Sequence, residues 1–452
     1  MSRSAVAGIA RGRPAATPGR SLAVLQRGLY HLLSFEAVFA LFFYSNQLKL
    51  LFPPFPVDET IVLLGLSLVA GGTVILREGI YLRGVPILTA FLIFVSWAAI
   101  SWGWSPSRRA AGDIVTLLLT LSSWALISGA LIMAPSRERV RRFLAFVLLF
   151  SLVIAVAGLV IYVRDGSFRF GGDFEGQGRV YLSWGFAAAS GAVIAFAWAI
   201  FSRMFGLQQL LAVVAFMLCA GFLLVNSGRG PLLSAAAGCA VALLVGLPRF
   251  SRGRVEIPRW QVAAMVAIAA IVAYGTYLVM SGAHVDTFAR FQKLFNQMEN
   301  PEIVQGRDRF AYFAAAIKFW LQAPILGNGL ASFARLYGGR DGAEGTYPHN
   351  LILELLTELG LVGLVLYGLV LWAGLRCLRL RPGALDGLQL CVLMLLASRL
   401  TTAMTSYNLP EQWPILIWCG LLAIRPLASA MPAAAPATAV RRPAYRAARS
   451  LR

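Results

Sequence analysis

A succession of apolar runs constrains the fold of this chain more than any other feature. Twelve runs can be counted, each close to the length of about 20 residues that a helix needs to cross some 30 Å of hydrocarbon. They cover residues 29–46, 60–76, 85–103, 113–133, 143–163, 180–202, 206–226, 231–248, 261–281, 350–375, 385–405 and 412–428. Lipid cannot satisfy unpaired backbone groups, and the runs lack the alternation of barrel strands. The sequence therefore predicts an all-α polytopic membrane bundle with about 12 transmembrane helices.

The composition supports this class and the charge pattern orients the bundle. Hydrophobic residues make up 58% of the chain and charged residues 13%, which excludes a water-soluble enzyme. The net charge of +20 is concentrated in short loops between the apolar runs, as the positive-inside rule requires, so no nucleic-acid partner is expected. With both ends cytoplasmic, the inner segments hold 25 Lys and Arg and the short outer loops hold seven.

This orientation divides the chain into five parts. We expect basic cytoplasmic tails at 1–28 and 429–452, nine transmembrane helices within 29–281, and three more within 350–428. Residues 282–349 form a large polar loop on the periplasmic side. The helical spacing of Phe310, Phe313, Ile317 and Trp320 before Ala323-Pro324 indicates that part of this loop is ordered.

Arginines on the outer side oppose the orientation signal and so point to a function. A guanidinium group presents a planar fork of donors that matches phosphate oxygens in pairs. A set of such groups near the membrane surface would suit a lipid-linked phosphate or diphosphate, although each could instead pair with a nearby acid or a lipid headgroup. Arg229 is the sharpest candidate because glycines on both sides allow close approach to its backbone. The set is Arg164, Arg169, Arg179, Arg229, Arg307 and Arg309.

A histidine and two glutamates stand at the start of the tenth run. His349, between Pro348 and Asn350, is a candidate base at a helix N-terminus, which disfavours the imidazolium form; the alternative is a histidine that bridges loop residues. Glu354 and Glu358 lie one helical turn apart in an apolar segment. One of them could orient His349 or pair with Arg399, or the two could be purely structural.

Several signatures are absent from the sequence. There is no outer Asp-x-Asp run, Walker lysine loop, zinc-ligand spacing or Gly-x-Ser-x-Gly elbow, and the five cysteines lie in or beside apolar runs without Cys-x-x-Cys spacing. We therefore expect chemistry that needs no metal, no cofactor and no nucleotide donor.

Four motifs give the chain a family resemblance. They are Trp102-Gly103-Trp104-Ser105-Pro106, Ser227-Gly228-Arg229-Gly230-Pro231, Gly306-Arg307 with Trp320 and Pro324-Ile325-Leu326-Gly327-Asn328-Gly329, and His349-Asn350 with Glu358-Leu359-Gly360-Leu361-Val362-Gly363. With these motifs the chain resembles the O-antigen ligase and polymerase superfamily of bacterial inner-membrane proteins.

The resemblance implies a metal-independent, inverting glycosyltransferase whose active site faces the periplasm. The donor would be a glycan on undecaprenyl diphosphate, and the acceptor a hydroxyl of another glycan or of lipid A core, among membrane lipids. Arg229 and Arg307 would hold the diphosphate, and His349 would activate or position the acceptor hydroxyl. Further substrate-binding candidates are Arg169, Arg309, Asn350 and Glu358.

Two alternatives stay open at this point. The family divides into ligases, polymerases and enzymes that glycosylate proteins, and the shared site does not separate them; a ligase or an exopolysaccharide polymerase is slightly favoured. A transporter or flippase for an anionic lipid-linked substrate would use the same arginines for binding alone, but it needs arginines along the middle of spans, where only Arg399 is found.

Overall fold

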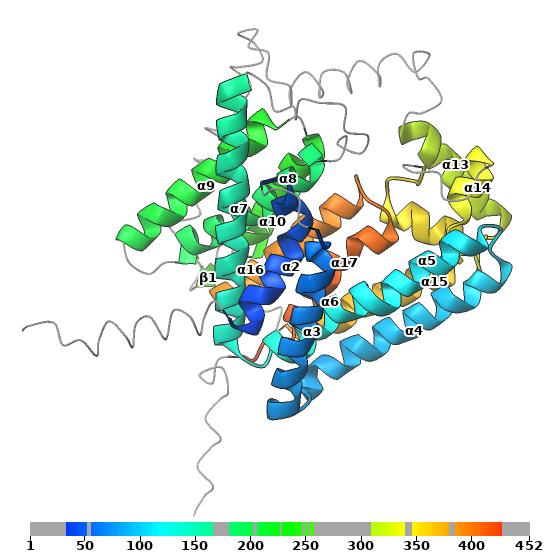
Figure 1. Cartoon of the computed structure of the whole chain (residues 1–452), viewed down its shortest axis with the longest axis horizontal. Coiled ribbons are helices and arrows are strands. Elements are labelled where there is room, and N and C mark those ends of the chain that lie inside the picture. The colour runs from blue at the N-terminus through cyan, green and yellow to red at the C-terminus, as the bar shows by residue number, and fades with distance from the viewer. Residues whose placement is uncertain are drawn as a thin grey trace, which may run out of the picture.

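The computed structural model is a bundle of helices (Figure 1). It describes residues 33–51, 56–165, 180–201, 206–226, 228–245, 249–251, 254–256, 309–339, 346–378 and 385–426. The predicted helical class is confirmed over these residues, with one addition. Two three-residue strands, β1 (Arg249–Ser251) and β2 (Arg254–Glu256), pair antiparallel in a predicted inner loop. The tails 1–28 and 429–452 and the predicted ninth span at 261–281 lie outside the described residues.

Helices occupy the other eleven apolar runs, and not all of them are long. Those that are long and apolar enough to cross a membrane are seven: Glu59–Glu78, Leu82–Trp104, Arg108–Met133, Arg137–Asp165, Val180–Ile200, Leu207–Val225 and Leu351–Leu375. The predicted number of about 12 spans is therefore not confirmed within the described part of the chain. The elements are α2 (Phe35–Leu48), η1 (Lys49–Leu51), α3 (Glu59–Glu78), η2 (Leu82–Gly84), α4 (Val85–Ser101), η3 (Trp102–Trp104), α5 (Arg108–Leu117), η4 (Leu118–Ser122), α6 (Ser123–Ile127), η5 (Ser128–Met133), α7 (Arg137–Asp165), α8 (Val180–Phe201), α9 (Leu207–Val225), α10 (Arg229–Val245), α13 (Arg309–Gln322), α14 (Ser332–Gly338), α15 (Leu351–Leu375), α16 (Gly387–Ala403), η8 (Leu409–Gln412) and α17 (Trp413–Leu421).

Helix α8 is the centre of one half of the bundle. It packs against α7, α9, α10 and α16, and its Trp184 is completely buried. Small residues allow this density: a Cβ atom on Gly191 would lie 2.5 Å from the Cβ of Ser151 on α7. Without a strong hydrophobic force between helices in lipid, such close contact between backbones is what holds spans together.

The other half is built on α4 and α15, which lie side by side (Figure 1). Helix α17 joins the halves, because it contacts α15, α16 and the π-helical segment η5. A Cβ atom on Gly129 of η5 would lie 2.5 Å from the carbonyl oxygen of Ile417, so only glycine fits between these two backbones. Hydropathy alone does not indicate this interruption of the 108–133 helix.

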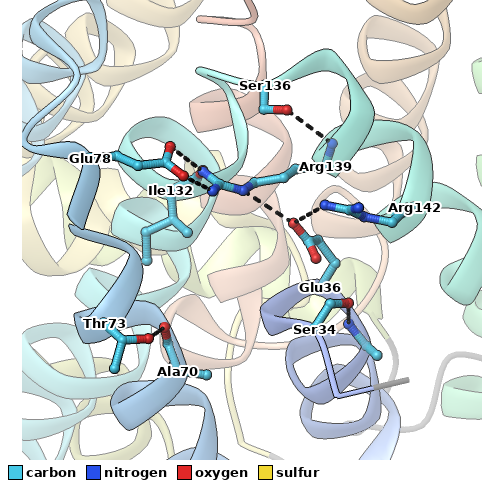
Figure 2. A network of polar contacts seen from close by, with 10 residues as sticks. Ser34, Glu36, Ala70, Thr73, Glu78, Ile132, Ser136, Arg139 and Arg142 are labelled. Carbon is cyan, nitrogen blue, oxygen red and sulfur yellow. Dashed lines mark hydrogen bonds and ion pairs between the residues drawn. The ribbon is translucent and has the colours of Figure 1, made fainter. Parts of the chain in front are cut away.

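One end of the bundle carries a network of ion pairs, which we call the charged end (Figure 2). The buried carboxylate of Glu36 lies 3.4 Å from Nε of Arg139 and 3.3 Å from a terminal nitrogen of Arg142, and Arg139 also pairs with Glu78. These contacts join the starts of α2 and α7 to the end of α3. The loops that follow the second and the fourth apolar runs, both cytoplasmic in the predicted orientation, thus come together.

The same end holds a second ion pair. Both terminal nitrogens of Arg137 donate to the carboxylate of Asp386, at 2.9 and 2.8 Å. Burial alone would raise the pKa of Asp386, but the hydrogen bonds from Arg137 and from the backbone N–H groups that the side chain caps hold it below its usual value. The start of α16 is therefore fixed to the start of α7.

Candidate functional site

A kink in α15 organises the opposite end of the bundle. Gly360 has φ 67° inside this helix, where a Cβ atom would lie 2.2 Å from the carbonyl oxygen of Ile325. The break frees two N–H groups of α15: that of Leu361 donates to Pro324 at 2.9 Å and that of Val362 to Ile325 at 3.2 Å. The segment 324–329 is thus inserted into the kink.

The Trp102–Pro106 motif packs against this segment. The indole of Trp104 donates to the carbonyl of Gly327 at 3.2 Å, and the hydroxyl of Ser105 donates to that of Leu330 at 2.6 Å. Trp97 lies earlier in the chain than Trp104, on α4. Its indole donates to the carbonyl of Leu359 on α15 at 3.1 Å. Three of the four motifs therefore meet at one place and are joined by hydrogen bonds to backbone carbonyl groups; we call this contact the motif junction.

Glu358 is part of the motif junction. Its carboxylate, 5% exposed, accepts hydrogen bonds from the backbone N–H groups of Ala331 at 2.8 Å and Phe333 at 3.4 Å. It therefore caps the N-terminus of α14, where a negative charge is favourable. Of the roles considered for Glu358, the structural one accounts for these contacts.

Helices α13 and α14 are held on α15 by this junction and lie beyond the ends of α4 and α5 (Figure 1). The predicted helix around Phe310–Trp320 is confirmed, because α13 covers Arg309–Gln322 and ends immediately before the predicted breaker. The hydroxyl of Thr357 on α15 donates to the carbonyl of Ala316 on α13 at 3.0 Å. A small aromatic core of Tyr312, Phe333, Phe319 and Tyr337 joins α13 to α14.

His349 lies where this module meets the bundle. It directly precedes Asn350, whose side chain accepts from the N–H of Leu353 and caps α15. The backbone of His349 is left-handed, with φ 54°, a conformation that histidine adopts more readily than most residues but still at a cost. Its ring is half-buried between Tyr347, with centroids 4.0 Å apart, and Tyr312, with centroids 5.6 Å apart.

The turn between α16 and α17 connects this histidine to the rest of the bundle. The phenol oxygen of Tyr347 accepts from the N–H of Tyr407 at 3.1 Å. The side-chain amide of Asn350 donates to the carbonyl of Met404 at 3.5 Å. The buried carboxylate of Glu354 accepts from the N–H of Leu409 at 2.9 Å. Among the described residues Glu354 forms no ion pair with Arg399, so that sequence-based alternative finds no support.

The start of α10, which carries Arg229, meets the same turn from the other side. It is the first residue of α10, and a Cβ atom on the adjacent Gly230 would lie 3.1 Å from Oγ1 of Thr405. The preceding turn is fixed because the side-chain amide of Asn226 donates to the carbonyl of Tyr181 at 2.9 Å. Residues 404–409 therefore contact both the start of α10 and the start of α15, and bring the elements that carry Arg229 and His349 to one end of the bundle.

The remaining sequence candidates are placed in part. Arg309 is exposed at the first position of α13, three residues before Tyr312, and residues so spaced lie on one face of a helix. Arg309 therefore belongs to the helical face that reaches His349. Arg169, Arg307 and Arg179 lie outside the described residues. Among the residues that the structure does describe, no group of three or more His, Cys, Asp or Glu side chains gathers to hold a metal ion.

The sequence analysis missed the two tyrosines whose rings lie beside His349. Tyr347 comes from the loop before α15 and Tyr312 from α13. Only Tyr347 carried a local signal, because it is two residues from His349. Tyr312 is distant from His349 in sequence, and only the fold brings it near.

The geometry now allows comparison with known proteins. Residues 214–368 match the family model described as O-antigen ligase, and this match confirms the resemblance to the O-antigen ligase and polymerase superfamily. The match includes Arg229, Arg309, His349 and the part of the motif junction that lies between residues 324 and 363. No curated protein matches the chain. Together with the apolar helices, the family match supports a multi-pass membrane protein of the glycan ligase or polymerase type.

Proposed function

We propose that this chain is an inner-membrane glycosyltransferase that moves a glycan from undecaprenyl diphosphate to an acceptor hydroxyl, with its site facing the periplasm. The observation that carries the proposal is the meeting of the elements of Arg229 and His349, two residues inside the family match, at the turn 404–409. A basic group at a helix N-terminus and an imidazole at the same end of a bundle suit an anionic leaving group and a hydroxyl nucleophile.

The reaction is a single displacement. The imidazole of His349 accepts the proton of the acceptor hydroxyl while the oxygen attacks the anomeric carbon. The bond from that carbon to the diphosphate oxygen breaks, and its electron pair leaves with the diphosphate, so that the anomeric configuration is inverted. Arg229, with Arg307 and Arg309, stabilises the charge that develops on the leaving group. His349 then returns its proton to water, and neither a metal nor a cofactor enters the cycle.

The aromatic contacts of His349 support its role as a positioned group. The rings of Tyr347 and Tyr312 contact the imidazole and restrict it, and the left-handed backbone fixes the direction in which it leaves the chain. A catalytic base must be held in a fixed position, whereas a histidine that merely bridges loop residues need not be. Asn350, by contrast, has its side chain engaged at the helix cap, which favours a positioning role for it over contact with substrate.

The test is glycan transfer in a deletion strain that carries variants of the chain. His349→Ala should abolish transfer while the protein still inserts and purifies normally. Arg309→Ala, at an exposed position, should weaken donor use without loss of folding. Activity of purified His349→Ala close to that of the unmodified protein would refute the assignment of His349, and inhibition by a chelator would refute the metal-free scheme.

The same strain separates the subclasses. Accumulation of single lipid-linked repeats indicates a polymerase, and accumulation of long chains on the lipid carrier indicates a ligase. We favour either of these over an enzyme that glycosylates proteins.

A transporter or flippase for an anionic lipid-linked substrate remains the second candidate, because Arg399 lies within a span. That candidate predicts that His349→Ala still moves substrate across the membrane and that surface glycan persists.

A further inference from the structure

Arg399 is a half-buried basic residue of an otherwise apolar helix, with a buried Nε atom. It lies in the last turns of α16, and its guanidinium carbon stands 5.9 Å from the ring centroid of Phe186 on α8. It also interacts electrostatically with the phenols of Tyr44 on α2 and Tyr407 in the turn after α16. Arg399 therefore points between α2 and α8, on the bundle side of the turn that Arg229 and His349 share.

No acid compensates this charge within the described part of the chain. The structure describes seven ion-pair contacts, and none includes Arg399. Its Nε atom is buried and donates no hydrogen bond to a described residue. Three carboxylates of that end, those of Glu354, Glu358 and Glu411, accept hydrogen bonds from backbone N–H groups.

The surroundings of Arg399 are polar rather than acidic. The phenol of Tyr44 lies 2.9 Å from the hydroxyl of Ser151, with Ser190 beside it. Hydroxyl groups can complete the hydrogen bonds of an anion but cannot neutralise a cation. Because an unpaired guanidinium inside a membrane bundle is costly, a charge of opposite sign is needed at this position.

We propose that Arg399 binds a phosphate group that enters the bundle between α2 and α8 from the end that carries Arg229 and His349. Tyr407 and the hydroxyls around Tyr44 serve as further hydrogen-bond partners. The phosphate belongs either to a prenyl diphosphate or to the headgroup of an anionic lipid. Only the first of these sources rests on the proposed function, in which Arg399 holds the diphosphate from the interior while Arg229 holds it from the rim.

The experiment compares Arg399→Met with Arg376→Met in detergent. Arg376 ends α15 and stacks on Trp372, with 4.4 Å from its guanidinium carbon to the ring centroid, so it is a matched control away from the site. The probes are farnesyl diphosphate, titrated against purified protein, and phosphatidylglycerol, quantified as lipid that co-purifies. We expect Arg399→Met to bind one of them at least tenfold more weakly and Arg376→Met to bind both unchanged.

The two probes identify the source. Weaker binding of farnesyl diphosphate alone assigns the site to a prenyl diphosphate, and loss of phosphatidylglycerol alone assigns it to a lipid headgroup. Unchanged binding of both probes by Arg399→Met would overturn the proposal.

Stability provides a second, independent readout. If a bound anion is what compensates Arg399, Arg399→Met in the delipidated, ligand-free protein should unfold at the same or a higher temperature than the unmodified chain. A clear fall would mean that Arg399 has a structural partner in the protein, and the proposal would be wrong. Binding at Arg399 is measured without glycan transfer, so a failure of the His349 assignment leaves it standing, and its own failure leaves the transfer experiment unaffected.

Discussion

We expect the substitution of Gly360 by alanine to destabilise the protein strongly. Gly360→Ala adds a Cβ atom 2.2 Å from the carbonyl oxygen of Ile325 and 2.5 Å from the nitrogen of Gly327, both closer than any normal contact. These are backbone atoms, so no side-chain rotation relieves the clash. Alanine is also strained at φ 67°, ψ −169°, at a cost of about 1–3 kcal/mol.

The clash can be relieved only by moving the segment 324–329 out of the kink. That movement breaks four backbone hydrogen bonds, from Asn328, Gly329, Leu361 and Val362. At about 0.5–1.5 kcal/mol each, they add some 2–6 kcal/mol to the strain. We therefore expect Gly360→Ala to lose at least about 3 kcal/mol and to release α13 and α14 from α15.

A thiol-reactive dye measures this loss, because four of the five cysteines are buried and become reactive only on unfolding. Limited proteolysis of residues 309–339 reports the release of α13 and α14. The matched control is Gly368→Ala on the same helix, where an added Cβ atom meets nothing within 4 Å and should be neutral or mildly stabilising. If both variants unfold at the same temperature and resist protease equally, the described role of the kink is wrong.

Three further predictions concern carboxylates that form ion pairs or cap a helix. Glu358→Ala should cost about 2–5 kcal/mol, because it leaves two buried N–H groups of α14 without an acceptor, and thermal unfolding in detergent should register this even when no substrate is present. Asp386→Asn should cost about 1–2 kcal/mol at pH 7; because the pKa of Asp386 is lowered in the fold, its contribution is complete above the ordinary value near 3.9 and disappears as the pH falls through the folded value, so the variant and the unmodified protein should converge in acid. Glu36→Gln should destabilise the protein by about 1–3 kcal/mol because Arg142 loses its acid, and the double variant with Arg142→Gln should recover part of that loss; no recovery would contradict the pairing.

The positions of the apolar helices could be predicted from the sequence, but the irregularities within and between them could not. Hydropathy located α4, α7, α8 and α15 because a membrane imposes the same length and polarity on every span. It did not predict the π-helical segments η4 and η5 or the shortness of α17. These depend on contacts with other helices, such as that of Gly129 with Ile417, which no local pattern encodes.

The motifs indicated the family resemblance, but the sequence did not show which residues they would contact. His349 lies immediately before Asn350, the N-cap residue of α15, as the start of the tenth run predicted. Trp104 and Glu358, by contrast, gave no sign that their partners would be Gly327 and the backbone of Ala331. A tryptophan donating to a carbonyl 223 residues away leaves no periodicity in the sequence.

The motif junction also fixes the order in which the chain can mature during synthesis. Trp104 and Ser105 emerge from the ribosome more than two hundred residues before their acceptors Gly327 and Leu330, and those acceptors settle only when the Gly360 kink has been made. His349 precedes Gly360 by eleven positions, so the nascent chain contains the histidine before it contains the glycine of the kink. The motif junction can therefore form only late in synthesis, after the tenth run has been made.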